Sequence, residues 1–196
     1  MQAFDSLSRN IQQYIYDKGW PSLTRIQNAA IKQVANTDHN LILSAPTASG
    51  KTEAAFIPAL NSVEDWDTGL KVLYISPLKA LINDQFQRIS ELSAYLDIPI
   101  TPWHGEVSQA QKKKVVNQPK GILLITPESI EGMLVNRPGK AQHLFKGVEW
   151  IIIDELHSFL GTERGVHLQS LLQRISQFMQ APRFIAMSAT LNKKDF

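Results

Sequence analysis

Small residues followed by Gly50, Lys51 and Thr52 give residues 45–52, APTASGKT, the composition of a phosphate-binding loop. In such a loop, backbone N–H groups at a helix N-terminus hold phosphate oxygens, the lysine reaches the outer phosphates, and the hydroxyl binds Mg²⁺. The predicted nucleotide-binding residues of this loop are Thr47, Ala48, Ser49, Gly50, Lys51 and Thr52. A connector rich in glycine and serine ahead of an amphipathic helix is the alternative interpretation.

Ala45 stands where the usual pattern of a phosphate loop begins with glycine. Glycine is indispensable only where φ is positive or where the backbone passes very close to a ligand. Alanine at this position is therefore acceptable if its φ is negative.

Two acidic residues, Asp154 and Glu155, lie at the end of another apolar run, EWIIID at 149–154. A carboxylate in that position can hold the Mg²⁺ that bridges nucleotide phosphates, so Asp154 and Thr52 are the predicted metal ligands. Glu155 is suited to orient the attacking water or accept its proton. The predicted catalytic residues are therefore Lys51, Asp154 and Glu155, although helix capping or solvation is the alternative for the acidic pair.

Five apolar runs are expected to form the strands that position these residues, at 40–44, 71–76, 121–126, 149–154 and 183–188. Each run is apolar on both faces, which is typical of parallel strands covered by helices on both sides. Helical periodicity in 78–92 and 165–179 lies between runs. The alternation predicts an α/β fold with a mostly parallel sheet in one domain spanning residues 1–196.

Each of the five runs is followed by a polar motif: SAPTASGKT, SPLKAL, TPES, DELH and SAT. Ligands of parallel sheets lie beyond the carboxyl ends of the strands. We therefore expect all five motifs to meet along one edge of the sheet.

In this order the motifs resemble motifs I, Ia, Ib, II and III of superfamily 2 helicases, over essentially the whole chain. The form DELH, followed by SFLGTERGVHLQSLLQRI, is most similar to the large helicase-related (Lhr) proteins, with DEAD-box and Ski2-like helicases as neighbours. The resemblance implies a RecA-like motor domain that uses ATP and Mg²⁺ and whose motif I commonly begins with alanine. Ala48 departs from the glycine usual in these families, but the departure removes no N–H donor.

Residues 1–36 resemble the adenine-recognition segment of these helicases. Phe4 matches the aromatic residue that stacks on the base and Gln27 matches the glutamine that bonds its edge; Arg25 is assigned to nucleotide binding with them. Glutamine can pair bidentately with adenine, which would select adenine nucleotides. Core packing of Phe4 and a solvated position for Gln27 are the alternatives.

Two loops are assigned to a single nucleic acid strand, because each opens a helix whose N–H groups could hold backbone phosphates. The resemblance implies that such contacts do not read base sequence. The assigned residues are Pro77, Leu78, Lys79, Thr126, Pro127 and Glu128. A plain surface position is the alternative for Lys79.

The lysine-rich run QKKKVVNQPK holds Lys112, Lys113, Lys114 and Lys120 and is more typical of a solvated helix face than of a binding patch. Trp103 follows another possible strand, where it could stack on a base or equally be buried.

Ser188 and Thr190 of MSATL are expected to bond the acidic pair through their hydroxyls and to sense the γ-phosphate. The resemblance implies that this motif couples hydrolysis to strand movement, and His157 is assigned to the same network. A satisfied interior histidine is the alternative for His157.

Composition excludes several other classes of protein. The hydrophobic content of 43% is that of a globular chain, the formal charge of +2 does not by itself argue for nucleic acid, and the absence of cysteine excludes disulfides and thiolate metal sites. The histidine spacing indicates no structural metal. No apolar run approaches the ~20 residues of a membrane span, so we expect a soluble, cytoplasmic chain without a membrane partner.

The sequence therefore predicts the ATP-binding motor domain of a superfamily 2 nucleic acid helicase, with DNA slightly favoured over RNA. Motifs IV to VI are not found within the 196 residues, so a second RecA-like domain is the expected partner. The alternatives are a DEAD-box or Ski2-like RNA helicase domain, a P-loop NTPase acting on something other than nucleic acid, and a non-catalytic binding module. The SPLKAL and TPES loops argue against the second, and Lys51, Thr52, Asp154 and Glu155 against the third.

Overall fold

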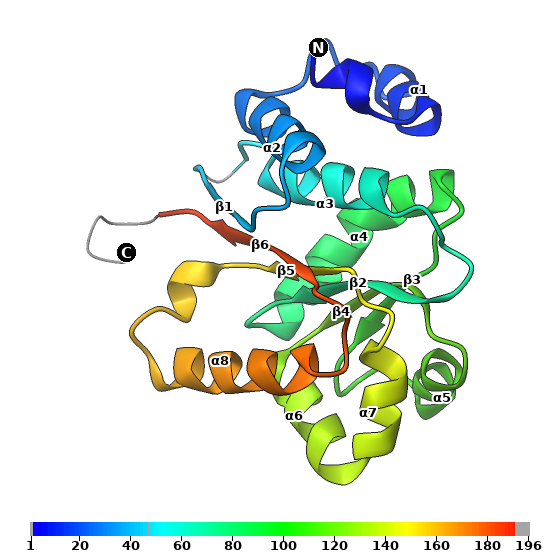
Figure 1. The fold of residues 1–196 in the computed structure, drawn as a ribbon, viewed down its shortest axis with the longest axis vertical. Coiled ribbons are helices and arrows are strands. Elements are labelled where there is room, and N and C mark those ends of the chain that lie inside the picture. Colours follow the sequence, from blue (N-terminus) through cyan, green and yellow to red (C-terminus); the bar gives the residue numbers. More distant parts are fainter. Residues whose placement is uncertain (1, 47, 191–196) are drawn as a thin grey trace.

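A parallel sheet forms the centre of the computed structural model, which describes residues 2–46 and 48–190 (Figure 1). Within these residues the sheet has six strands in the order β1-β6-β5-β2-β4-β3. The strands are β1 (Leu41–Ser44), β2 (Gly69–Ile75), β3 (Ile100–Trp103), β4 (Lys120–Ile125), β5 (Trp150–Ile153) and β6 (Arg183–Ser188). The predicted α/β fold is confirmed.

Helices cover both faces of this sheet (Figure 1). One face shares a hydrophobic core with η1 (Phe4–Ser6), α1 (Arg9–Asp17), α2 (Arg25–Asn36), α3 (Lys51–Ser62) and α4 (Lys79–Tyr95). The other packs against α5 (Gln109–Asn117), α6 (Pro127–Asn136), α7 (Pro138–Phe145), η2 (Leu156–Ser158) and α8 (Glu163–Ser176). Along β5, Ile152 belongs to the first core and Ile151 and Ile153 to the second, as the two-residue period of a strand requires.

The carboxyl ends of the strands lie level with one another. Ile75 of β2 pairs with Ile125 of β4 on one side and with Ile153 of β5 on the other. Ser44 of β1 pairs with Ser188 of β6 in the same way. The loops that follow these strands therefore leave the sheet at one edge.

The expectation that every strand is covered on both faces is wrong for β1. It lies at the edge of the sheet, and Ile42 is 49% exposed. The possible strand before Trp103 is β3, and Trp103 itself is buried. The helix expected at 165–179 is α8, which begins earlier because Thr162 caps it by accepting a hydrogen bond from the N–H of Gly165 at 3.1 Å.

None of the helices described is long and apolar enough to cross a membrane.

Glu131 joins α6 to α8. Its carboxylate accepts hydrogen bonds from both terminal nitrogens of Arg174 and lies 3.0 Å from Nε2 of His167. The hydrogen bonds from Arg174, and then from His167, lower the pKa of Glu131 from 4.5 to about 2. Glu131 thus holds the helix after β4 against the helix that follows the DELH motif.

We expect Glu131→Gln to lower the melting temperature by ~2 °C at pH 7. The pKa of Glu131 is depressed in the folded state, so its stabilisation is present above about pH 4.5 and is lost as the pH falls toward about 2. The difference from wild type should therefore shrink over that range in a thermal unfolding series. Glu64→Gln, at an exposed loop position, is the control, and a difference that stays constant with pH would contradict the role of this ion pair.

Candidate nucleotide and strand site

The predicted phosphate loop connects β1 to α3, and Gly50 caps that helix with φ of 82°. Ala48 also has a positive φ, of 64°. Positive φ outside glycine occurs among the described residues at Ala48, Asp97, Glu155 and Ala181, so Ala45 does not need to be glycine. Thr47 lies outside the described residues.

Lys51 and Thr52 begin α3 and carry the polar groups of the loop. Nζ of Lys51 donates to the backbone carbonyls of Ala45 and Pro46, the latter at 2.7 Å. The hydroxyl of Thr52 is buried and donates to Oε1 of Gln85 at 3.0 Å. The hydroxyl oxygen of Ser49 is also buried and has no hydrogen-bond partner among the described residues.

Asp154 follows β5 and is buried, with 6% of its surface exposed. One carboxylate oxygen accepts from the hydroxyl of Tyr74, and the other accepts from the N–H of Glu155 at 2.9 Å. Burial raises the pKa of Asp154, although the bond from Tyr74 and the charge of Lys51 act in the opposite direction. Glu155 has φ of 48°, a left-handed conformation that costs a non-glycine residue energy.

These two motifs share one cavity of about 90 Å³. It is lined by Ala48, Gly50, Lys51, Thr52, Gln85, Arg88, Asp154, Glu155 and Met187. Gln85 and Arg88 come from the middle of α4 and were missed by sequence reasoning, because no local motif marks them. Arg88 also donates to Glu53 of α3 at 2.9 Å.

His157 connects the DELH motif to the SAT motif. Its Nδ1 lies 3.1 Å from the hydroxyl of Ser188, and its Nε2 lies 3.3 Å from a carboxylate oxygen of Glu155. Ser188 donates to the carbonyl of Thr190 at 2.7 Å. The expected direct bond from Ser188 to the acidic pair is therefore wrong, because its hydroxyl contacts the imidazole of His157 and the carbonyl of Thr190; the role of the Thr190 hydroxyl stays a prediction. His157 is also exposed, which excludes the interior alternative.

Gln27 contacts the phosphate loop from α2. Its Oε1 accepts from the N–H of Thr24 at 2.9 Å, completing a capping box, and its Nε2 lies 3.4 Å from the carbonyl oxygen of Gly50. A Cβ at Gly50 would come within 2.6 Å of that Nε2, so the contact requires glycine. The solvated alternative for Gln27 is wrong, because only 4% of the residue is exposed.

Phe4 and Arg25 do not join Gln27. Phe4 lines a separate cavity of about 410 Å³ that also includes Trp20 and Leu23. Neither Gln27 nor Arg25 is among its lining residues, and Arg25 is exposed. The structure thus brings Gln27, but not Phe4 or Arg25, to the phosphate loop.

Arg164 joins the two loops assigned to a nucleic acid strand. Its guanidinium donates to the carbonyl of Pro77, and its Nε and Nη2 donate to one oxygen of Glu128 at 3.0 and 2.7 Å. Sequence reasoning gave Arg164 no role, although it lies in the stretch SFLGTERG after the DELH motif. The loops that follow β2 and β4 are thus held together by a residue of α8, the helix that follows β5 in the chain.

Some side chains of these two loops already have partners within the protein. Lys79 forms an ion pair with Glu106, whereas Leu78 is exposed. The hydroxyl of Thr126 caps α6 by accepting from the N–H of Ser129 at 3.4 Å.

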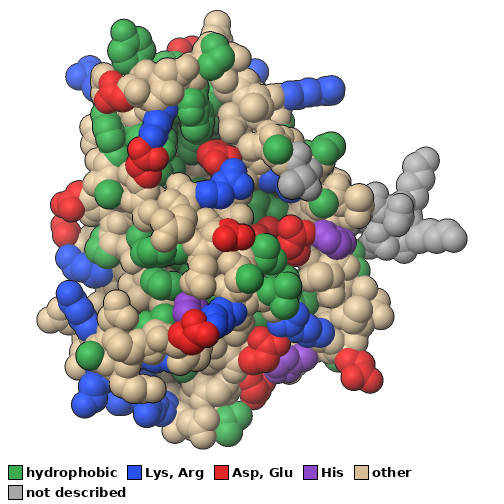
Figure 2. Space-filling view, turned by 180° about the vertical axis from the view of Figure 1, so that it is seen from behind, with side chains coloured by type: hydrophobic (Ala, Val, Ile, Leu, Met, Phe, Trp, Pro, Cys, Tyr) green, Lys and Arg blue, Asp and Glu red, His purple; other side chains and the backbone are tan. Residues whose placement is uncertain are grey.

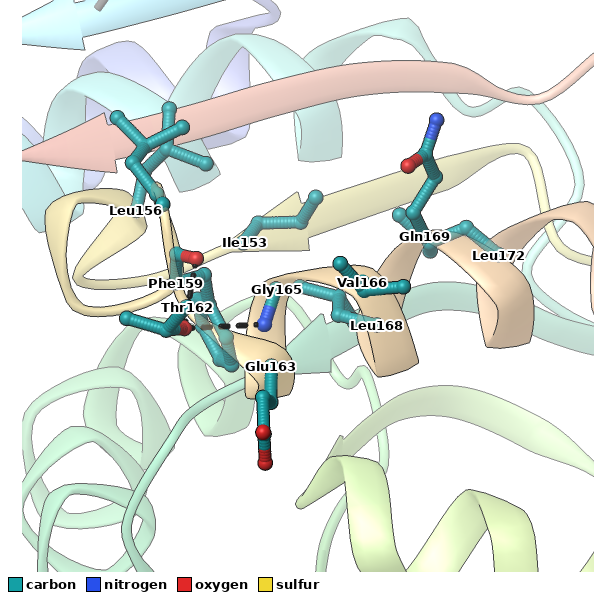
Figure 3. A pocket seen from close by; sticks show the side chains of 12 residues that line it. Ile153, Leu156, Phe159, Thr162, Glu163, Gly165, Val166, Leu168, Gln169 and Leu172 are labelled. Atoms are coloured by element: carbon teal, nitrogen blue, oxygen red, sulfur yellow. Dashed lines mark hydrogen bonds between the residues drawn. The ribbon is translucent and has the colours of Figure 1, made fainter.

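A larger, apolar hollow of about 690 Å³ lies beside the DELH motif (Figure 3). Figure 3 shows Leu156 and Phe159 on one side of it and Val166 and Leu172 of α8 on the other. Glu163 is the one titratable residue that lines it among those described. The hollow therefore lacks the groups that phosphate chemistry needs.

A phosphate loop ahead of α3, a buried carboxylate after β5 and polar loops along the same sheet edge define a RecA-like P-loop NTPase domain. The chain belongs to the DEAD/DEAH box helicase family, whose model matches residues 24–196.

Two curated relatives illustrate the similarity. The ATP-dependent helicase Lhr-Core of Methanocaldococcus jannaschii is 30% identical over 97% of this chain and 24% of its own length. The Lhr helicase/uracil glycosylase of Escherichia coli is 34% identical over 86% of this chain and 12% of its own length.

Among solved structures, the Mycobacterium smegmatis helicase Lhr bound to ssDNA and AMP-PNP matches with a TM-score of 0.87 and 27% identity, over 100% of this chain and 26% of that one. This chain therefore spans about a quarter or less of the length of these relatives. The resemblance to superfamily 2 helicases of the Lhr type is confirmed.

Ala48→Gly should stabilise the protein, because an L-residue at positive φ costs about 1 kcal/mol. The expected change is a rise in melting temperature of about 3 °C. Ala94→Gly, at an exposed helical position of α4, should lower stability by about 1 kcal/mol. Thermal unfolding of both variants measures the difference, and a loss of stability in both would show that Ala48 is unstrained.

Proposed function

We propose that this chain is the ATP-binding motor domain of a superfamily 2 helicase, and that in a whole helicase it couples ATP hydrolysis to translocation along or unwinding of nucleic acid. The observation that carries the proposal is the cavity that Lys51, Thr52, Asp154 and Glu155 share. It lies at the edge of the sheet from which the two loops assigned to a nucleic acid strand also leave, after β2 and β4.

The groups around this cavity fit ATP with Mg²⁺. Lys51 bonds only to backbone carbonyls among the described residues, and the buried hydroxyl of Ser49 has no partner there. A carboxylate and a hydroxyl are the hard oxygen ligands that Mg²⁺ prefers. Thr52 and Asp154 would hold the ion, which would neutralise charge that develops on the transferred phosphate.

The residues of this chain then have separate tasks. Lys51 exchanges the carbonyls of Ala45 and Pro46 for outer phosphate oxygens, while loop N–H groups bind the others. Glu155 orients the attacking water and accepts its proton. His157, which contacts both Glu155 and Ser188, transmits the state of the γ-phosphate toward the SAT motif.

Adenine recognition is assigned to Gln27, which is the one of the three predicted residues that contacts the phosphate loop. The bond from Nε2 of Gln27 to Gly50 is long, at 3.4 Å, so adenine can replace it at little cost. The fixed Oε1, held by Thr24, keeps the amide in one orientation.

Gln27→Glu tests this role without removing the helix cap. Glutamate still accepts from the N–H of Thr24, but it loses the Nε2 donor. Wild type should prefer ATP over GTP, and the variant should lose that preference about fivefold.

Isothermal titration with ATP and GTP in the presence of Mg²⁺ measures both affinities. Equal affinities in the wild type would exclude adenine selection. Lys51→Ala is the matched control for phosphate binding, because it should weaken the binding of ATP and of GTP alike.

The loops after β2 and β4 support binding to a single nucleic acid strand. Lys79 and the N–H groups at the start of α6 face the same sheet edge, tied together through Arg164. The solved relative bound to ssDNA favours DNA, and a second RecA-like domain is the proposed partner that completes the cleft.

Lys79→Ala should weaken the binding of single strands of every base sequence alike, because phosphate contacts position a strand without reading its bases. The slope of log K against log salt should fall in magnitude by roughly 0.7, the contribution of one phosphate. ATP affinity should not change. Fluorescence anisotropy with labelled single strands across a salt series measures the slope.

Lys146→Ala, at an exposed position after α7, is the control for loss of one charge. Equal slopes for wild type and Lys79→Ala would place the strand elsewhere.

A further inference from the structure

A second polar groove lies between α5, α6 and α7, outside the nucleotide cavity. Its volume is about 380 Å³, and Lys112, Lys113, Arg137 and Lys140 line it. Polar side chains such as Asn117 accompany them, and no carboxylate is among the residues that line it. Seen from behind the view of Figure 1, lysine and arginine side chains gather over this part of the molecule, at the lower left (Figure 2).

The positive charge of this groove is uncompensated within the described residues. None of its four basic residues forms an ion pair with a described carboxylate. Lys112 instead lies over the ring of Trp103, with its Nζ 5.7 Å from the ring centroid. Four like charges around one hollow repel one another, so a bound polyanion is the occupant that would relieve the repulsion.

The lysine-rich run therefore does not act as one uniform solvated face. Lys112 and Lys113 line the groove, whereas Lys114 does not. Lys120 lies beyond the helix and pairs with Asp67 at 3.4 Å.

The groove is continuous with the strand loops. Trp103 ends β3 and Ser129 lies in the first turn of α6, and both line the groove. It therefore opens at the sheet edge where Thr126 caps α6 and follows that helix toward Arg137. A helix of ten residues is ~15 Å long, which is enough for more than one phosphate of a single strand to lie along it.

We propose that this groove binds the sugar-phosphate backbone of the single strand that crosses the loops after β2 and β4. The inference rests on the proposed function and deepens it, because it extends the strand path along α6. Lysine and arginine in an open groove neutralise phosphates without selecting bases, so the contacts are independent of sequence.

Two double variants test the groove independently, Lys112→Gln with Lys113→Gln, and Arg137→Gln with Lys140→Gln. Fluorescence anisotropy is measured with labelled oligothymidylate of about 6 and about 14 nucleotides. Each pair should reduce the salt slope for the longer strand by about 1.4 in magnitude, twice the contribution of one phosphate, and lower its affinity about tenfold at low salt. Binding of the shorter strand, which the loops alone can hold, should change little.

The charge-matched control is Lys114→Gln with Lys146→Gln, both exposed and outside the groove. If the groove variants behave like this control while Lys79→Ala still weakens both strands, the groove proposal is wrong and the proposed function stands. If wild type binds neither strand, both are wrong. Oligoglutamate that binds wild type but not the groove variants, with strand binding unchanged, would assign the groove to an acidic protein segment and overturn the proposal.

Discussion

Parallel pairing with level strand ends is the constraint on which the rest of this structure depends. Ser44 and Ser188 pair at the ends of β1 and β6, and Ile75 pairs with both neighbours at the end of β2. Each strand must then be reached by a crossover on one face of the sheet, so each polar loop leaves from the same edge. Nucleotide groups and strand loops that lie far apart in the chain thereby become neighbours.

The site that this edge creates is stable only because its polar groups are paired. Burial raises the pKa of Asp154, so its charged form costs stability at neutral pH, and Tyr74 and the N–H of Glu155 offset that cost. Helix α4 links the nucleotide cavity to the loops assigned to the nucleic acid strand. It begins at Lys79, in a loop assigned to the nucleic acid strand, and contacts Thr52 through Gln85, six residues later.

Much of this arrangement could be predicted, because apolar runs mark buried strands and the motifs follow their ends. Burial of Gln27 was missed, although Thr24 three residues earlier forms the signature of a capping box. Arg164 carried no such signal, because its partners Pro77 and Glu128 become neighbours only through the order of the strands. The exposure of β1 could not be predicted either, because its position at the edge depends on the order of the strands in the sheet and not on its own residues.

The most direct test of the nucleotide site is the Mg²⁺ dependence of ATP affinity in Asp154→Asn, measured by isothermal titration with and without Mg²⁺. Asparagine keeps the shape of the buried side chain and an acceptor for Tyr74, but it loses the charge that would hold the ion. Wild type should bind ATP more tightly with Mg²⁺, and the variant should lose most of that gain while keeping its affinity without the ion. A variant that retains the full gain would contradict the assignment of Asp154 and, with it, the proposed ATP·Mg²⁺ site.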